Sequence, residues 1–175
     1  MLTIRQEQLS DTASISRVHQ EAFSHRTEAD LVERLRTRGK FKISLTAEIK
    51  GQVVGHILFT EVNIKGSDSG ISILGLAPMA VLPEFQRRGV GSELIRRGLG
   101  LCQESGHDVV VVVGHPEYYP RFGFVPASRY GLRCEYDVPD DVFMALELRA
   151  GALRETSGLV RYQPEFADSD GIADG

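Results

Sequence analysis

The chain has 175 residues, of which 42% are hydrophobic and 25% are charged, and its formal net charge is -4. This length fits one domain with a sizeable core, and the acidic balance excludes the basic surface that is typical of nucleic-acid binding. The sequence contains neither a membrane-length apolar run nor a signal-peptide pattern, so we expect a cytoplasmic protein with no membrane partner.

The N-terminal part predicts one strand followed by two helices. Alternating apolar residues indicate a strand over residues 2–5. Ser10 or Asp11 is suited to cap the first helix. Thr27 and Asp30 resemble a capping box at the start of the second helix.

A hairpin and a long apolar strand are expected next. Two strands, over residues 43–49 and 53–64, are separated by Lys50-Gly51, which favours a tight turn. A polar loop leads from them to an apolar strand over residues 71–82. Pro78 cannot donate a ladder hydrogen bond, so a bulge is expected where it interrupts this strand.

The clearest helix of the sequence begins after Gly89 and ends at Gly106. Gly98 lies within its apolar stripe and lowers helix propensity, which indicates close packing of the helix on a sheet. A run of five valines over residues 109–113 then predicts a buried parallel strand. Strand, helix and strand together form a βαβ unit.

The rest of the chain is rich in glycine, proline and aromatic residues, with further strands expected over residues 142–148 and 159–162. No linker or internal repeat divides the sequence. We therefore expect one domain over residues 1–165, followed by a disordered tail over residues 166–175 that is small, acidic and poor in apolar side chains.

Residues 86–92, with the sequence QRRGVGS, connect the long strand to the glycine-flanked helix. Unpaired N–H groups at a helix start attract anions, and glycine lets a ligand approach the backbone, so this turn predicts a diphosphate site. The dinucleotide fingerprint fails because Leu94 stands where its third glycine is needed, and no Gly-Lys-Ser/Thr sequence of a mononucleotide P-loop is present.

A second motif, YYPRFGF over residues 118–124, follows the valine strand. Together with the Gln/Arg-x-x-Gly-x-Gly turn and the order of elements, it resembles the GNAT N-acetyltransferase superfamily, and within it the YhbS-type branch of predicted acetyltransferases. The resemblance covers about residues 1–165 and implies an α/β fold of the acyl-CoA N-acyltransferase type. Its sheet would be mostly antiparallel, with a parallel βαβ splay that holds the cofactor and helices on both faces.

The resemblance implies that acetyl-CoA is the donor and that no metal is required. The pyrophosphate would lie on the turn, and the pantetheine arm would pair with the splayed strand. The implied cofactor-binding residues are Met79, Ala80, Val81, Gln86, Arg87, Arg88, Gly89, Val90, Gly91, Ser92, Tyr119 and Phe122.

Two of these residues are also implied in the chemistry. The Met79 N–H is the candidate donor to the acetyl carbonyl oxygen. Tyr119 matches the family's general-acid tyrosine, which protonates the departing thiolate, whereas Tyr118 matches a neighbouring packing aromatic. The alternative for Tyr119 is a buried aromatic ring whose hydroxyl group has a structural partner.

The group that removes a proton from the acceptor amine is left open by the sequence. Glu61, His115 and Glu117 are candidates, as is water alone, and none of the three lies in a decisive motif. His56 alternates with apolar residues and fits either the site lining or the core.

The expected activity is direct acetyl transfer to a primary amine of an unidentified small molecule or peptide. The alternatives are an acyltransferase that uses a longer acyl-CoA or an acyl carrier protein, and a non-catalytic CoA-binding regulatory module. The longer-chain alternative predicts that Ile57, Phe59 and Phe122 line an elongated channel. Cys102 and Cys134 match no ligand spacing and give no support to a covalent relay, and formation of a homodimer is left open.

Overall fold

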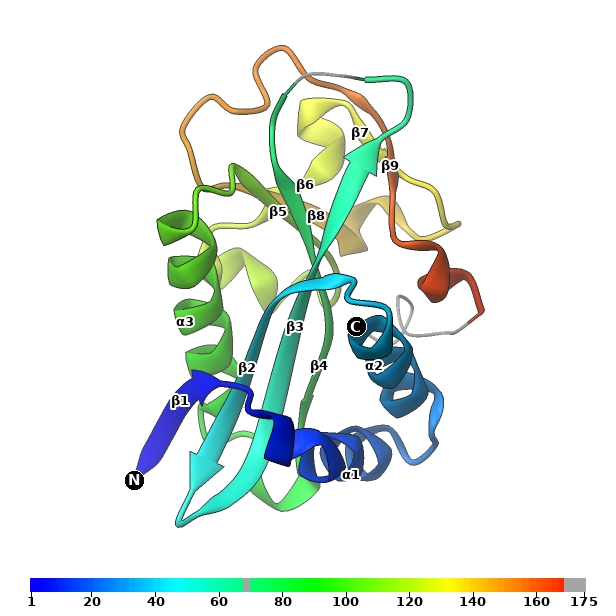
Figure 1. Cartoon of the computed structure of the whole chain (residues 1–175). Helices are drawn as coiled ribbons and strands as arrows, with labels where there is room; N and C mark the ends of the chain where they lie inside the picture. Colours follow the sequence, from blue (N-terminus) through cyan, green and yellow to red (C-terminus); the bar gives the residue numbers. More distant parts are fainter. Residues whose placement is uncertain (68–69, 169–175) are drawn as a thin grey trace.

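The computed structural model describes residues 1–67 and 70–168 of the chain (Figure 1). These residues form three α-helices: α1 (Thr12–Phe23), α2 (Thr27–Thr37) and α3 (Val90–Glu104). They also form nine strands: β1 (Leu2–Gln6), β2 (Phe41–Ile49), β3 (Gln52–Ile64), β4 (Ile73–Val81), β5 (Val109–Val113), β6 (Val125–Pro126), β7 (Leu132–Cys134), β8 (Phe143–Glu147) and β9 (Gly158–Arg161). Short 3-10 helices are η1 (Leu9–Asp11), η2 (Pro83–Phe85), η3 (Tyr119–Phe122), η4 (Ala127–Tyr130), η5 (Asp140–Val142) and η6 (Pro164–Asp168).

The strands form a mixed sheet in the order β1-β2-β3-β4-β5-β8-β6, and β9 joins β7 to the far end of β3. Along the main path, every neighbouring pair is antiparallel except β4 and β5. The predicted hairpin is confirmed, because β2 and β3 pair up to Ile49 and Gln52 with Lys50 and Gly51 at positive φ between them.

The predicted βαβ unit is β4–α3–β5, and its two strands separate along their length. Parallel pairing joins only Ile73–Gly75 of β4 to Val109–Val111 of β5. The predicted bulge in β4 is also confirmed, since Met79 pairs with Ile57 whereas Leu76 pairs with Phe59. The end of β4 is thus freed from β5 and stands at the start of α3.

Helices cover both faces of the sheet, with α3 on one side and α1 and α2 on the other (Figure 1). Two apolar clusters form the core: Leu94 and Ile95 of α3 belong to one, Leu31 and Leu35 of α2 to the other, and α1 contributes to both. Close packing at Gly98 is confirmed, since a Cβ atom there would lie 2.6 Å from the ring of Phe59. This contact packs α3 closely against β3.

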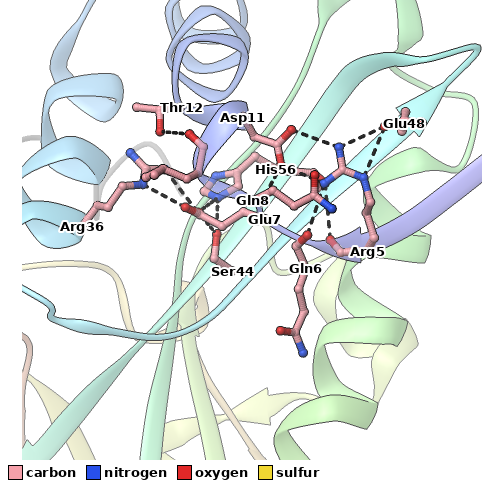
Figure 2. Close-up of polar contacts among 12 residues, drawn as sticks. Arg5, Gln6, Glu7, Gln8, Asp11, Thr12, Arg36, Ser44, Glu48 and His56 are labelled. Carbon is pink, nitrogen blue, oxygen red and sulfur yellow. Dashed lines mark hydrogen bonds and ion pairs between the residues drawn. The ribbon is translucent and has the colours of Figure 1, made fainter.

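The details of two helix starts differ from the prediction. The N-cap of α2 is Arg26, with no capping hydrogen bond from its side chain, so the expected capping box at Thr27 is wrong. Asp11 does precede α1, but its carboxylate accepts hydrogen bonds from Arg5 at 2.7 and 3.0 Å and from the N–H of Gln8 at 2.6 Å (Figure 2). Arg5 also binds Glu48, so these ion pairs hold the end of β1 against β2 and α1.

The C-terminal end also corrects the prediction. Residue 166 was expected to begin a disordered tail, but Phe166 belongs to η6 and is 1% exposed. Its ring lies 5.4 Å from that of Tyr162, centroid to centroid, so the ordered chain extends past residue 165 because this aromatic side chain completes the core. Residues 169–175 of the expected tail lie outside the described residues.

Candidate functional site

The turn over residues 86–92 has the backbone shape that an anion cradle needs. Arg87 and Gly89 both adopt left-handed backbone, with φ of 63° and 84°. A Cβ atom at Gly89 would meet nothing within 4 Å. Glycine is favoured there because of the left-handed backbone conformation, and not because a side chain would clash. A non-glycine residue in this region costs of order 1–2 kcal/mol, and such strain gathers at ligand sites. α3 begins directly afterwards, so the N–H groups of its first turn and its positive dipole end lie in this turn.

A cavity of about 540 Å³ lies beside this turn, within the size range of small-molecule sites. The end of β4, the start of α3, the end of α1 and the aromatic segment after β5 all contribute to its wall. The lining residues are Ala22, Phe23, Met79, Ala80, Val81, Gln86, Arg87, Gly89, Gly91, Ser92, His115, Tyr118, Tyr119 and Arg121.

Three of the residues predicted to bind the cofactor lie outside this lining. Arg88 places its guanidinium group 5.6 Å from the ring centroid of Phe85. Val90 is 2% exposed and belongs to the core, and Phe122 lies beneath the guanidinium group of Arg96, 5.4 Å from it. The other nine predicted residues are brought together on the cavity wall: Met79, Ala80, Val81, Gln86, Arg87, Gly89, Gly91, Ser92 and Tyr119.

The charged groups on the cavity wall favour an anionic ligand. Arg87 and Arg121 supply guanidinium groups, which bind phosphate oxygens through charge-assisted hydrogen bonds. None of the described residues that line the cavity carries a carboxylate. The side chain of Gln86 is held in place at the end of β4, because its amide donates a hydrogen bond to the carbonyl oxygen of Val81 at 2.9 Å.

The walls on either side of the cavity approach each other at Gly91 and Met79. A Cβ atom at Gly91 would lie 3.4 Å from the hydroxyl oxygen of Tyr118 and 3.6 Å from the methyl carbon of Met79. The same tyrosine hydroxyl group is 3.1 Å from the Oγ of Ser92. Tyr118, which the sequence suggested as a packing aromatic, is therefore joined by a hydrogen bond to the first turn of α3.

Tyr119 lines the cavity and is 3% exposed. Its ring packs on Gly114, where a Cβ atom would lie 2.3 Å away, and on Phe124 at 5.7 Å between centroids. Burial, and secondarily the neighbouring Tyr118, raise the pKa of the Tyr119 hydroxyl group well above its ordinary value. The group therefore holds its proton across the physiological pH range, as a proton donor must.

The three candidate bases lie in different places. His115 lines the cavity and is exposed. Glu117 is exposed and lies outside the lining. Glu61 forms an ion pair with Lys42 at 3.7 Å and pairs in register with Leu74, four residues farther along β3 than the position opposite Met79.

The prediction from sequence did not include three of the lining residues. Ala22 and Phe23 reach the cavity from α1, where they had the appearance of ordinary apolar-face residues. Arg121 also lines the cavity, and its guanidinium group lies 4.7 Å from the ring centroid of Tyr118. Its position within the motif over residues 118–124 was the available clue.

The longer-chain alternative loses its expected channel. Ile57 and Phe59 are both fully buried beneath α3, and neither lines the cavity. Both cysteines are free; burial raises the pKa of the Cys102 thiol to about 12, and neither residue lies on the cavity wall. In residues 1–67 and 70–168, no group of three or more histidine, cysteine or acidic side chains is placed to bind a metal ion, and no helix is long and apolar enough to span a membrane.

Comparison with known proteins agrees with this geometry. Residues 3–127 match the family model of an acetyltransferase (GNAT) domain. The chain is 34% identical over 166 residues to the N-acetyltransferase YhbS of Escherichia coli (strain K12), an alignment that covers 94% of this chain and 98% of the relative. The crystal structure of E. coli YhbS in complex with CoA matches with a TM-score of 0.90 at 34% identity, covering 95% of this chain and 92% of the other. A GNAT family acetyltransferase from Brucella melitensis in complex with acetyl-CoA matches with a TM-score of 0.78 at 33% identity, covering 95% and 98%.

Proposed function

Because the chain belongs to the GNAT acetyltransferase family and is an N-acetyltransferase, we propose that it transfers the acetyl group of acetyl-CoA directly to a primary amine of a small molecule or peptide. The observation that carries this proposal is the cradle at residues 86–92. Left-handed backbone at Arg87 and Gly89 leads into the first turn of α3 beside a cavity whose charged side chains are cationic. That arrangement suits the pyrophosphate of CoA.

The splayed end of β4 supports the placement of the pantetheine arm. Beyond Gly75, β4 no longer pairs with β5, and Met79, Ala80 and Val81 line the cavity. An extended arm that pairs with this free strand would bring the thioester toward Tyr119, which lines the same cavity. The Met79 N–H is then the proposed donor to the acetyl oxygen.

Tyr119 is proposed to donate a proton to the sulfur that leaves. Its buried hydroxyl group stays protonated, as the raised pKa requires. A thiol of pKa about 8.5 is already a tolerable leaving group, so this donor contributes less than the group that binds the oxyanion. No cysteine lines the cavity within the described residues, which supports direct transfer rather than an acyl-enzyme.

The acceptor is proposed to enter on the α1 side, where Ala22 and Phe23 form the wall. An amine of pKa about 10.4 is neutral in only about one molecule in a thousand near pH 7, which corresponds to a penalty of about 4 kcal/mol. Removal of its proton is therefore part of the chemical problem.

Titration calorimetry with CoA and acetyl-CoA tests the donor, and thiol release from acetyl-CoA tests the transfer. The acceptor panel contains spermidine, kanamycin, free amino acids and peptides with a free N-terminal amine. We expect CoA and acetyl-CoA to bind, and one amine class to accelerate thiol release. Absence of CoA binding would overturn the proposal, and stronger turnover with octanoyl-CoA than with acetyl-CoA would favour the longer-chain donor.

A further inference from the structure

Among the described residues, two arginines give the cavity wall its permanent positive charge. Arg87 lies in the turn before α3, whereas Arg121 lies in η3, after β5. A guanidinium group keeps its proton at any physiological pH. Neither a lysine nor a carboxylate lines the cavity within residues 1–67 and 70–168. The cavity thus offers an anionic ligand two fixed charges that come from separate segments of the chain.

Coenzyme A carries two separate anionic groups. A diphosphate joins its pantetheine arm to the 5′ position of a ribose, and a monophosphate stands on the 3′-hydroxyl of the same ribose. A phosphate monoester has a charge of about −1.5 to −2 at pH 7. Because the ribose lies between the two groups, each needs its own set of donors.

The turn over residues 86–92 accounts for the diphosphate. Its left-handed backbone at Arg87 and Gly89 leads into the N–H groups of the first turn of α3, so the charge of Arg87 belongs to the same cradle. The pantetheine arm is proposed to leave this cradle along residues 79–81 of β4. The ribose and its monophosphate then extend from the opposite end of the diphosphate, away from β4.

Arg121 is held beside the first turn of α3. Its guanidinium group lies over the ring of Tyr118, 4.7 Å from the centroid. The hydroxyl group of Tyr118 is 3.1 Å from the Oγ of Ser92, the third residue of α3. This hydrogen bond joins the ring that supports Arg121 to the helix that begins at the cradle.

The guanidinium group of Arg121 is available to a ligand. Arg121 is exposed and forms no ion pair with any residue that the structure describes. Stacking on an aromatic ring uses the face of the guanidinium group and leaves its N–H groups free for phosphate oxygens. The side chain is thus positioned but not neutralised.

Nearby arginines are directed elsewhere. Arg96 of α3 forms an ion pair with Glu93 at 3.1 Å. Arg88 lies 5.6 Å from the ring centroid of Phe85 and outside the cavity lining. With Arg87 in the cradle, Arg121 is the lining charge that remains for the second anionic group of CoA.

We infer that Arg121 binds the 3′-phosphate of CoA and makes the donor site selective for CoA over dephospho-CoA, an inference that rests on the proposed placement of the diphosphate on the turn. Tyr118 is then a positioning residue, which holds the guanidinium group beside α3. A side chain that is already stacked loses less conformational entropy when it binds.

This role also bears on the choice of donor. The phosphopantetheine arm of an acyl carrier protein has one phosphodiester and lacks both the adenosine and the 3′-phosphate. Such a donor would leave Arg121 without a ligand. The arginine therefore favours a free acyl-CoA over an acyl carrier protein.

Titration calorimetry with CoA and with 3′-dephospho-CoA at low ionic strength tests the inference. We expect the wild type to bind CoA about 10-fold more tightly than dephospho-CoA, the size of one modest hydrogen-bonded charge pair. In Arg121→Gln this ratio should fall to about one, because the affinity for CoA falls and that for dephospho-CoA does not. The side chain is exposed, so thermal unfolding should stay at the wild-type temperature.

Three further variants separate the roles. Arg87→Gln should weaken both ligands by the same factor and keep the wild-type ratio, because it removes charge from the diphosphate cradle. Arg97→Gln, at an exposed position of α3 outside the cavity lining, removes the same charge and should bind both ligands as the wild type does. Tyr118→Leu should lower the ratio although Arg121 is present, and an unchanged ratio would overturn the positioning role of Tyr118.

Two results would overturn the inference and leave the proposed function standing. One is a wild type that binds CoA and dephospho-CoA with equal affinity at low ionic strength. The other is an Arg121→Gln variant that loses the same factor for both ligands, which would assign Arg121 to the diphosphate. A wild-type chain that binds neither ligand overturns the proposed function and the inference together.

Discussion

At Gly98 the absence of a side chain lets α3 lie directly against the sheet. A Cβ atom there would lie 2.6 and 2.7 Å from two ring carbons of Phe59, and that ring is fully buried. We predict that Gly98→Ala destabilises the protein by about 1–3 kcal/mol, because overpacking outweighs the gain of about 1 kcal/mol in helix propensity. Urea denaturation monitored by circular dichroism measures the difference.

Gly100 provides the control on the same helix. A Cβ atom at Gly100 would meet nothing within 4 Å. Gly100→Ala should therefore stabilise the protein by up to about 1 kcal/mol through helix propensity alone. If the two alanine variants change stability in the same direction, the packing explanation for Gly98 is wrong.

Tyr119 is both buried and the proposed proton donor. We predict that Tyr119→Phe lowers kcat by about 10- to 100-fold, at the low end for loss of a proton donor, with little change in CoA affinity. Because its pKa is raised in the folded state, the wild-type rate should show no loss from Tyr119 ionisation as pH passes 10. Stopped-flow thiol release across pH measures both. A wild-type rate in the phenylalanine variant at every pH would remove the acid role.

Among the elements, those governed by local periodicity were the predictable ones. The valine run 109–113 is β5 to the residue, and the Lys50-Gly51 turn is where expected, because alternation, turn chemistry and long apolar runs act over few residues. The two-residue β6 and three-residue β7 were missed, since their pairing partners β8 and β9 lie far along the chain. The α/β fold inferred from the two motifs is confirmed by the matching structures.

The residues of the candidate site also fall into two groups, those that a local motif predicts and those that only tertiary packing brings there. The turn residues follow from a contiguous motif, whereas Phe23 reaches the cavity only through the packing of α1 on β3 and β4. The sequence left His56 between a lining and a core role, and the structure places it in the core, where its Nδ1 lies 2.9 Å from the Nε2 of His19. No local pattern reports that two histidines 37 residues apart will share a hydrogen bond.

A substitution at the start of α3 should separate the stability of the helix from its binding of the diphosphate. Gly89→Asp introduces a carboxylate at the N-cap, where the helix dipole stabilises it, so the fold should lose no more than about 1–2 kcal/mol from the left-handed φ. Repulsion of the diphosphate should nonetheless abolish measurable CoA binding. Calorimetry and thermal unfolding separate the two effects.

Gly106→Asp is the comparison at the other end of α3. Gly106 also has positive φ, 87°, and open space around its Cβ position. Its variant should share the backbone strain and bind CoA as the wild type does. Equal CoA affinity in both aspartate variants would show that the turn does not hold the diphosphate.

At the scale of the whole molecule, charged side chains join the N-terminal segment to the rest of the fold. Arg5 of β1 binds Asp11 and Glu48, and Glu7 binds Arg36 of α2. These contacts tie β1 to the start of α1 and to β2, and the segment after β1 to α2. The packing of α2 on β2 thus depends on one carboxylate, Glu7, which pairs with Arg36 and accepts a hydrogen bond from Ser44 of β2.

That dependence predicts how stability responds to acid. The pKa of folded Glu7 is lowered, so below the unfolded value of about 4.3 the unfolded chain binds a proton that the folded chain does not. Its contribution is therefore complete above that pH and is lost as pH falls. We predict that Glu7→Gln loses about 2 kcal/mol at pH 7, because Arg36 loses its anionic partner, and that the variant has a shallower acid dependence below pH 4.3. Urea unfolding at several pH values measures it, with the exposed Glu104→Gln as control. Parallel pH curves for Glu7→Gln and the wild type would mean that Glu7 is not held ionised by the fold.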